Sequence, residues 1–219
     1  MEKQKNEWNN LSKEVESQTL KQKLYDDILF NFCGNLSNKK VLDFGCGTGE
    51  IVLRVKNNGA KVKAWDLSKN MRDTTIKKLG QGTVYNTLRQ IPPNYFDIVF
   101  CNLVICVVNK APVKEIIKIL NQALVENGIA FVGFCNPLSY NISESKIQKR
   151  FISGKSYSKE HEYKKLIKEG GFEITEKHRP LEFYEKTFLD NGFVIEDVKI
   201  SKDGADFIIY KLRKIKHGK

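Results

Sequence analysis

Hydrophobic residues recur with two periods along this chain of 219 residues. Short apolar runs predict buried strands, and apolar residues spaced three or four apart predict helices between them. This alternation of strand and helix predicts an α/β fold built on a mostly parallel sheet. The predicted strands cover 39–44, 61–66, 83–87, 95–103, 129–134, 193–198 and 206–210, and the predicted helices cover 8–32, 48–58, 112–127 and the segment after Pro180.

The first predicted strand ends at Asp43 and is followed by glycines at positions 45, 47 and 49. Glycine adopts positive φ and lets the backbone approach a ligand closely, and parallel sheets bind ligands at the carboxyl ends of their strands. Glu50 stands where the dinucleotide fingerprint has its third glycine, and the Gly-Lys-Ser/Thr of a P-loop is missing. The turn therefore predicts a cofactor with a cationic or zwitterionic end.

The spacing Asp43-x-Gly-x-Gly-x-Gly49 resembles the first motif of the class I S-adenosylmethionine-dependent methyltransferases, of the small-molecule, type 11-like kind. The similarity extends over about residues 38–135 and includes Phe96-Asp97. It implies a Rossmann-like sheet of seven strands, mostly parallel with an antiparallel last strand, and helices on both faces. It also implies S-adenosylmethionine as cofactor and S-adenosylhomocysteine as product.

The cofactor residues follow from this resemblance and from the strand ends. Asp66 lies 17 residues after Gly49 at the end of the second strand, where an acidic residue accepts hydrogen bonds from ribose hydroxyls; the alternative is a solvated carboxylate. An acidic residue usually follows the third strand in the family, but Asn86-Thr87-Leu88 stands there, so we expect a weaker adenine contact. The expected cofactor-binding residues are Asp43, Gly45, Cys46, Gly47, Gly49, Asp66, Leu67, Met71, Asn86, Thr87, Leu88, Asn102 and Leu103.

The acceptor side is less defined. His178 is the candidate general base by its intrinsic pKa, or else it caps the helix after Pro180. Tyr140 is a second catalytic candidate, and Tyr140 and Tyr157 are candidates to orient the substrate. Tyr25, or Trp8, lines the cleft or packs on the sheet edge, while Arg179 binds a substrate carboxylate or lies on the surface.

We expect one methyltransferase domain over residues 1–219, with an N-terminal helical lid at 1–34 and a cap insertion at about 136–179. The cap segment is longer than a crossover connection requires, and long insertions in compact domains are usually functional or disordered.

Composition narrows the partners. The net charge of +11 comes from 37 Lys and Arg against 26 Asp and Glu, and such an excess is compatible with nucleic acid. Acidic residues are interleaved with the lysines, however, and the Asn/Asp-Pro-Pro-aromatic motif of DNA amino-methyltransferases is missing after the fourth strand. We therefore expect a small-molecule acceptor and consider nucleic acid the less favoured partner.

Five cysteines without a C-x-x-C pair, and three scattered histidines, give no metal-ligand spacing and predict reduced thiols. No apolar stretch is long enough to span a membrane and no signal peptide is evident, so a cytoplasmic location is expected.

The predicted function is transfer of a methyl group from S-adenosylmethionine to an oxygen or nitrogen of a small metabolite. Two alternatives remain: an RNA or tRNA methyltransferase of the same fold, and a non-catalytic binding module that keeps the fold as a scaffold. The sequence does not indicate the oligomeric state.

Overall fold

The computed structural model describes residues 2–11, 21–152, 156–201 and 206–215. Its main sheet has six strands in the order β2-β1-β3-β4-β9-β8. The first four of these are mutually parallel, and β9 runs antiparallel to both of its neighbours. The strands are β1 (Lys40–Phe44), β2 (Lys61–Trp65), β3 (Phe96–Asn102), β4 (Leu124–Cys135), β8 (Phe193–Ile200) and β9 (Phe207–Lys214).

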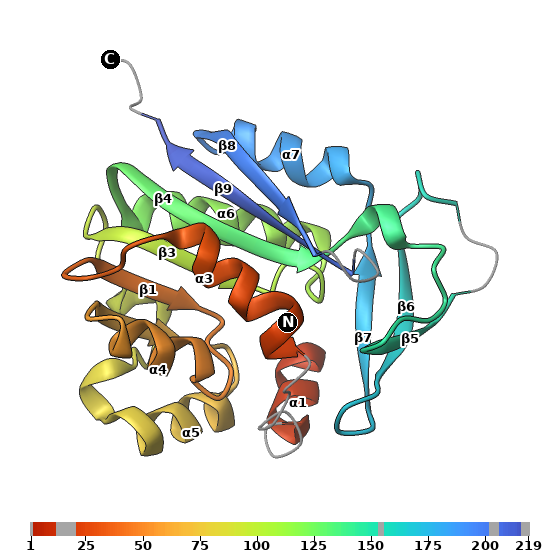
Figure 1. Cartoon of the computed structure of the whole chain (residues 1–219), viewed down its shortest axis with the longest axis horizontal. Coiled ribbons are helices and arrows are strands. Elements are labelled where there is room, and N and C mark those ends of the chain that lie inside the picture. The colour runs from red at the N-terminus through yellow and green to blue at the C-terminus, as the bar shows by residue number, and fades with distance from the viewer. Residues whose placement is uncertain (1, 12–20, 153–155, 202–205, 216–219) are drawn as a thin grey trace.

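Helices cover both faces of this sheet, which confirms the predicted Rossmann-like α/β fold. In Figure 1, α3 lies in front of the sheet and α6 and α7 lie behind it. The central strand β3 is buried along nearly its whole length, as expected for a parallel strand covered on both faces. The helices are α3 (Asp27–Cys33), α4 (Glu50–Asn57), α5 (Lys69–Leu79), α6 (Lys110–Ala123) and α7 (Leu181–Asp190).

The predicted third strand, at 83–87, is wrong in extent. Only Val84 pairs with the sheet, through one parallel bridge to Ala64, so the seventh strand of the expected fold is reduced to a single contact. The 3-10 turns η2 (Gln81–Thr83) and η3 (Leu88–Gln90) flank it, and a capping box between Thr87 and Gln90 closes the second turn. Local hydrogen bonds of these polar side chains therefore replace the strand ladder.

One helix prediction also needs correction. The helix expected to end at Asn127-Gly128 ends at Ala123, because Leu124 already pairs with Phe96 as the first residue of β4. Of the helix expected over 8–32, the described residues are helical: they belong to α1 (Glu2–Leu11), the π-helical turn η1 (Gln22–Asp26) and α3, while 12–20 lie outside the described residues.

Residues 136–179 contain a second, antiparallel sheet of three strands in the order β5-β6-β7. Its strands are β5 (Gln148–Phe151), β6 (His161–Ile167) and β7 (Phe172–His178), preceded by the turn η4 (Pro137–Ser139). Figure 1 shows it beside the carboxyl end of β4, next to α1. Phe172 and Ile174 pack there with Leu11 and Trp8 of α1.

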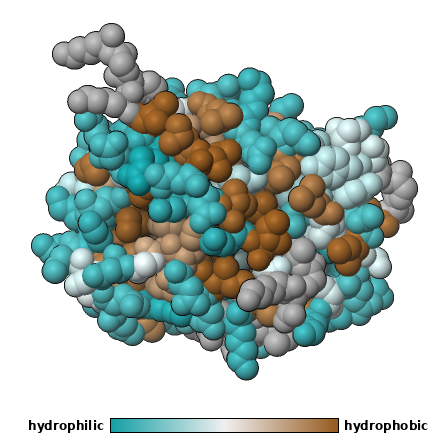
Figure 2. Space-filling view, turned by 45° about the horizontal axis from the view of Figure 1, so that its top comes forward, coloured by the Kyte–Doolittle hydropathy of each residue, from teal (hydrophilic) through white to brown (hydrophobic). Residues whose placement is uncertain are grey.

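On the face shown in Figure 2, hydrophilic residues cover most of the area and hydrophobic residues form patches between them. Among the described residues, no helix combines the length and hydrophobicity that a membrane span requires.

Candidate cofactor and acceptor site

The glycine turn after β1 has the backbone geometry that its sequence predicts. Gly45, Gly47 and Gly49 have φ values of 85°, 53° and 87°, which are accessible to glycine at little cost. The amides of Gly45 and Cys46 both donate to the carbonyl oxygen of Trp65, at 2.7 and 3.1 Å. These bonds fix the turn to the end of β2, so the ends of both strands form one shelf.

Asp66 connects the two strand ends through its carboxylate. Its Oδ2 accepts from the amide of Gly47 at 2.9 Å, and its Oδ1 accepts from the amide of Ser68 at 2.8 Å. Burial raises the pKa of Asp66, and these two amide donors oppose that effect. Ser68 in turn caps α5 by accepting from the amide of Met71, so the carboxylate and the helix start are held in one unit.

Two buried polar groups at this edge of the sheet point to a polar ligand. Asp43 is 1% exposed, and its Oδ2 has no hydrogen-bond partner among the described residues. Burial raises the pKa of Asp43 to about 7. Nδ2 of Asn102 likewise has no partner among them. Such groups are costly unless a ligand or water satisfies them, and an ammonium beside Asp43 would do so.

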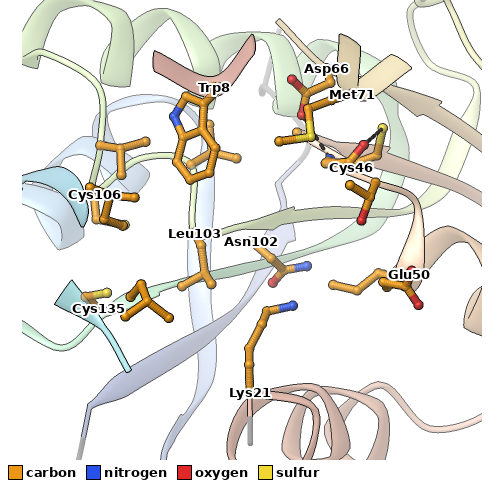
Figure 3. A pocket seen from close by; sticks show the side chains of 18 of the residues that line it. Trp8, Lys21, Cys46, Glu50, Asp66, Met71, Asn102, Leu103, Cys106 and Cys135 are labelled. Atoms are coloured by element: carbon orange, nitrogen blue, oxygen red, sulfur yellow. Dashed lines mark hydrogen bonds between the residues drawn. The ribbon is translucent and has the colours of Figure 1, made fainter. Parts of the chain in front are cut away.

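These groups line a cavity of about 220 Å³. Figure 3 shows Asp66, Met71 and Cys46 on one side of it and Cys106 and Cys135 on the other, with Asn102 and Leu103 between them. Leu103 has a φ of 59°, a conformation rare for a non-glycine residue and typical of functional positions. The far wall comes from the second sheet and includes Ile147, Lys165, Ile167, Phe172 and Ile174.

Comparison with known proteins agrees with this geometry. The sequence model of a family described as a methyltransferase domain matches residues 42–132, from β1 to β4. Residues 42–132 therefore form a domain of the class I S-adenosylmethionine-dependent methyltransferases.

Relatives of this methyltransferase include the ubiquinone biosynthesis O-methyltransferase of Rickettsia canadensis, which is 29% identical over 75% of this chain and 66% of its own length. The chain spans about half to two thirds of the curated relatives that it matches. A solved S-adenosylmethionine-dependent methyltransferase from Clostridium acetobutylicum is 17% identical, with a TM-score of 0.66 over 96% of this chain and 99% of its own. Magnesium protoporphyrin IX methyltransferase from Synechocystis, with S-adenosylmethionine bound, is 18% identical, with a TM-score of 0.59 over 89% and 79%. These two likenesses show the shared fold.

Most of the predicted cofactor residues lie around this cavity. Those that line it are Asp43, Gly45, Cys46, Gly47, Asp66, Leu67, Met71, Asn102 and Leu103. Gly49 is not part of the described lining, and it packs against α5, where a Cβ on it would meet Thr75. The described lining does not include Asn86, Thr87 or Leu88; the amides of Asn86 and Thr87 both donate to Gln90.

The candidate catalytic residues of this methyltransferase lie in a ring cluster at one end of the second sheet, where His161 of β6 pairs with His178 of β7. The rings of Tyr140 and Tyr157 lie 5.0 and 5.5 Å from that of His178, and the ring of His161 lies 4.8 Å from it. Nε2 of His178 lies 2.7 Å from the carbonyl oxygen of Tyr157, and burial lowers the pKa of His178. His178 makes no capping bond to α7, which corrects that alternative. The described cavity lining contains none of these rings.

Arg179 and Tyr25 are both buried and are separated from the described cavity lining. The Arg179 guanidinium donates to Glu160 at 2.7 Å and to the carbonyl oxygens of Ile105 and Val108 at 3.2 and 2.6 Å. It therefore holds the loop after β3, and the surface alternative is wrong. The hydroxyl of Tyr25 donates a hydrogen bond to Oδ1 of Asn102, which lines the cavity.

Several lining residues carry no sequence signal that marks them. Cys106, Cys135, Gln148 and Lys165 come from separate elements, and only the fold brings them together. Lys21 also lines the cavity, and its ammonium lies 3.0 Å from Asp26. Lysines are common in helical segments, so no local sequence pattern predicts that Lys21 lines a cavity.

Proposed function

We propose that this methyltransferase transfers a methyl group from S-adenosylmethionine to an oxygen or nitrogen of a small-molecule metabolite. The shape of the cavity carries the proposal, because it continues from the glycine turn to the apolar inner face of the second sheet. Ile147, Ile167, Phe172 and Ile174 supply that face. Enclosed apolar sites suit small ligands, whereas single-stranded nucleic acid requires a basic groove with stacking aromatics.

The polar groups of the cavity suit the parts of the cofactor. In this proposal Asp43 binds the ammonium of its methionine part and Lys21 binds the carboxylate. Asp66 accepts the ribose hydroxyls, and Met71 and Leu67 contact the adenine. The cofactor supplies a methyl group activated by sulfonium sulfur, so the task of the protein is to align the acceptor with it and to exclude water.

Two segments would provide this exclusion: 1–34 as a lid and 136–179 as a cap. In support, Trp8 of α1 lines the cavity together with the second sheet. The amide of Thr175 on β7 donates to the carboxylate of Glu7 on α1 at 2.9 Å. This bond joins the proposed lid to the proposed cap across the acceptor end of the cavity.

The names of relatives agree with a small acceptor. The Rickettsia protein is an O-methyltransferase of ubiquinone biosynthesis, and the Synechocystis protein acts on magnesium protoporphyrin IX. A cytoplasmic location is also part of the proposal, supported by five cysteines that are all free thiols.

The test is transfer of isotope-labelled methyl from S-adenosylmethionine in parallel incubations with a low-mass metabolite extract and with RNA from the same cells. The proposal predicts label in the low-mass products, and less of it with an Asp66→Ala variant when the cofactor is below saturation. Label in RNA would establish the nucleic-acid alternative. Tight binding of the cofactor without transfer to either fraction would establish the binding module.

A further inference from the structure

One cation is buried in the wall of the cavity that faces the glycine turn. Lys165 of β6 is 3% exposed and lines the cavity beside Cys106 and Cys135. The two cysteines lie across the cavity from Asp66 in Figure 3. An ammonium group is seldom buried without a partner or a ligand. The groups around Lys165 therefore indicate its function.

Lys165 has two partners in this wall. Its Nζ lies 2.9 Å from Sγ of Cys135 and forms an ion pair with Glu176 of β7. Glu176 is 2% exposed and stands behind the lysine, outside the described cavity lining. An ammonium has three N–H donors, and these partners account for two of them.

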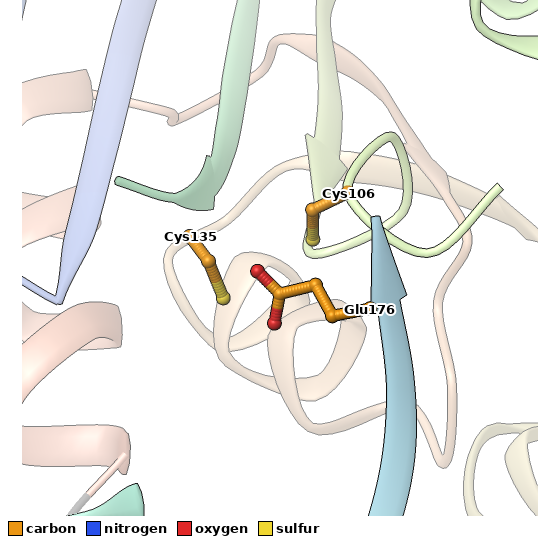
Figure 4. Close-up of side chains that lie close together, drawn as sticks. All are labelled: Cys106, Cys135 and Glu176. Carbon is orange, nitrogen blue, oxygen red and sulfur yellow. The ribbon is translucent and has the colours of Figure 1, made fainter. Parts of the chain in front are cut away.

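The same cluster resembles a metal site at first sight. One ligand atom each from Cys106, Cys135 and Glu176 lies within 4.8 Å of the others. Figure 4 shows the three side chains pointing toward one another. The ammonium of Lys165, however, already contacts both Cys135 and Glu176 and supplies the positive charge there. A divalent cation would have to displace this ammonium. We therefore interpret the cluster as the surroundings that hold Lys165.

The charge of Lys165 is stable in this setting. Burial opposes its protonated form, but the neighbouring Cys135 and Glu176 reverse that effect, and its pKa lies above the ordinary value. Burial raises the pKa of the Tyr163 hydroxyl, which stays neutral. Arg150 of β5 is neutralised by Asp206 at 2.8 Å.

We propose that Lys165 binds an ionised oxygen of the methyl acceptor, and that the acceptors are therefore oxygen acids: phenols, enols or carboxylic acids. This rests on the proposed function, since it concerns the acceptor of the same reaction. Lys165 and Glu176 together are neutral, so an anionic acceptor is balanced by the positive sulfonium. The apolar walls then favour the reaction, because both charges disappear as the methyl group moves.

The chemical step balances without a protein base. The acceptor loses its proton to solvent as it binds beside the ammonium. An oxygen lone pair then forms the new oxygen–carbon bond while the carbon–sulfur bond breaks, and the bonding electrons stay on sulfur. The products are a neutral ether or ester and neutral S-adenosylhomocysteine. This accounts for a cavity whose described lining contains no histidine.

4-Nitrophenol is a suitable probe because its phenolate is coloured. We would titrate it into the protein with and without S-adenosylhomocysteine, at a pH where the free phenol is mostly neutral. A positive charge within contact distance favours the ionised form by about tenfold or more. We expect the ratio of ionised to neutral probe to be about tenfold or more higher on the protein than in solution. Benzoate should displace the bound probe, and benzamide should not.

A Lys165→Met/Glu176→Gln variant removes both charges of the pair and leaves no lone buried ion. It should lose the ionisation of the bound probe, and its thermal melt verifies that it is folded. Lys164→Met is the matched control: its side chain points outward, 67% exposed, and pairs with Glu173. It should behave as the wild type.

Three results would overturn the inference: a bound probe that ionises as it does in solution, an ionisation that survives in the double variant, and no binding of either nitrophenol or benzoate. The proposed function fails differently. Its failure would leave the probe ionised on the protein, with no methyl transferred to it or to any small molecule.

Discussion

The hydroxyl of Tyr25 donates a hydrogen bond to Oδ1 of Asn102, with 2.5 Å between the two oxygens. Tyr25 belongs to η1 and Asn102 ends β3, so this bond joins the N-terminal segment to the cavity. Gly133 makes room for it, since a Cβ there would lie 1.7 Å from the Tyr25 oxygen. The bond fixes the amide of Asn102 and leaves its Nδ2 for a ligand.

Tyr25→Phe should therefore destabilise the protein and weaken cofactor binding. It leaves Oδ1 of Asn102 buried without a donor, which costs about 1–3 kcal/mol. Urea unfolding with and without S-adenosylhomocysteine measures both effects. Tyr95→Phe removes a hydroxyl from a side chain that is 40% exposed and should change neither. Equal effects of the two substitutions would contradict the role given to the buried bond.

The ionisation of Asp43 should make stability and cofactor binding respond to pH in opposite directions. Burial raises its pKa to about 7 in the folded protein, from an ordinary value of 3.8. The folded state therefore binds a proton more readily than the unfolded state. The protonated Asp43 carboxyl therefore contributes to the free energy of unfolding. This contribution is full below about pH 4 and is lost as the pH rises through 7, by at most about 4 kcal/mol.

Asp43→Asn should remove this component, so the difference in unfolding free energy between variant and wild type should grow from pH 4 to pH 8 in favour of the variant. The variant should bind S-adenosylhomocysteine more weakly at pH 8, because it lacks a carboxylate for the ammonium. Denaturant titrations at several pH values measure the first effect and calorimetry measures the second. Parallel stability curves for the two proteins would refute the assignment.

Gly45→Ala should destabilise the protein by more than the backbone strain at this position alone accounts for. A left-handed conformation costs a residue with a Cβ about 1–2 kcal/mol, and the new Cβ would also lie 2.2 Å from Cγ2 of Val104. Gly171→Ala is the control, with a φ of 67° and open space around the new atom. We expect the Gly45 variant to lose more stability in thermal melts and to lose cofactor affinity, which the control keeps. Similar melting temperatures and affinities would argue against a close approach at Gly45.

The ring cluster around His178 gives a fourth prediction. His178 is 4% exposed and bonded to the backbone of Tyr157, so we expect His178→Asn to lower the melting temperature and to leave turnover at saturating acceptor nearly unchanged. A general base contributes about 10²–10⁴-fold to the rate. A loss of turnover of that size in a folded variant would instead establish His178 as the base.

Local pattern was enough to predict the cofactor half of the molecule. Asp43, the glycines and Asp66 lie at the ends of adjacent parallel strands, and strand order alone places such residues together. The extent of the third strand was mispredicted because Thr87 and Gln90 form a local capping box that no hydrophobic period indicates. The helix expected to reach Asn127 ended early because pairing of Leu124 with Phe96 overrode the helical period.

The acceptor half could not be predicted because its residues meet only in three dimensions. Lys165, Cys135 and Glu176 belong to three strands of two sheets, and in the sequence Lys165 is one of many lysines. The chemical types of His178 and Arg179 predicted roles in catalysis and substrate binding. The fold instead places His178 in a ring cluster and Arg179 under a loop. The type of a residue does not predict which way its side chain points, because its neighbours in space decide that.

The central claim is that the glycine turn and Asp66 together bind S-adenosylmethionine, and calorimetric titration with S-adenosylhomocysteine tests it most directly. Asp66→Ala removes the acceptor for the ribose hydroxyls and the partner of the Gly47 amide. Hydrogen bonds to charged groups are worth about 1.5–3 kcal/mol, so the dissociation constant should rise about tenfold to a hundredfold. Asp73→Ala, which removes an exposed carboxylate paired with Lys69, should leave the dissociation constant unchanged. An Asp66→Ala variant that is folded and binds as tightly as the wild type would contradict the account.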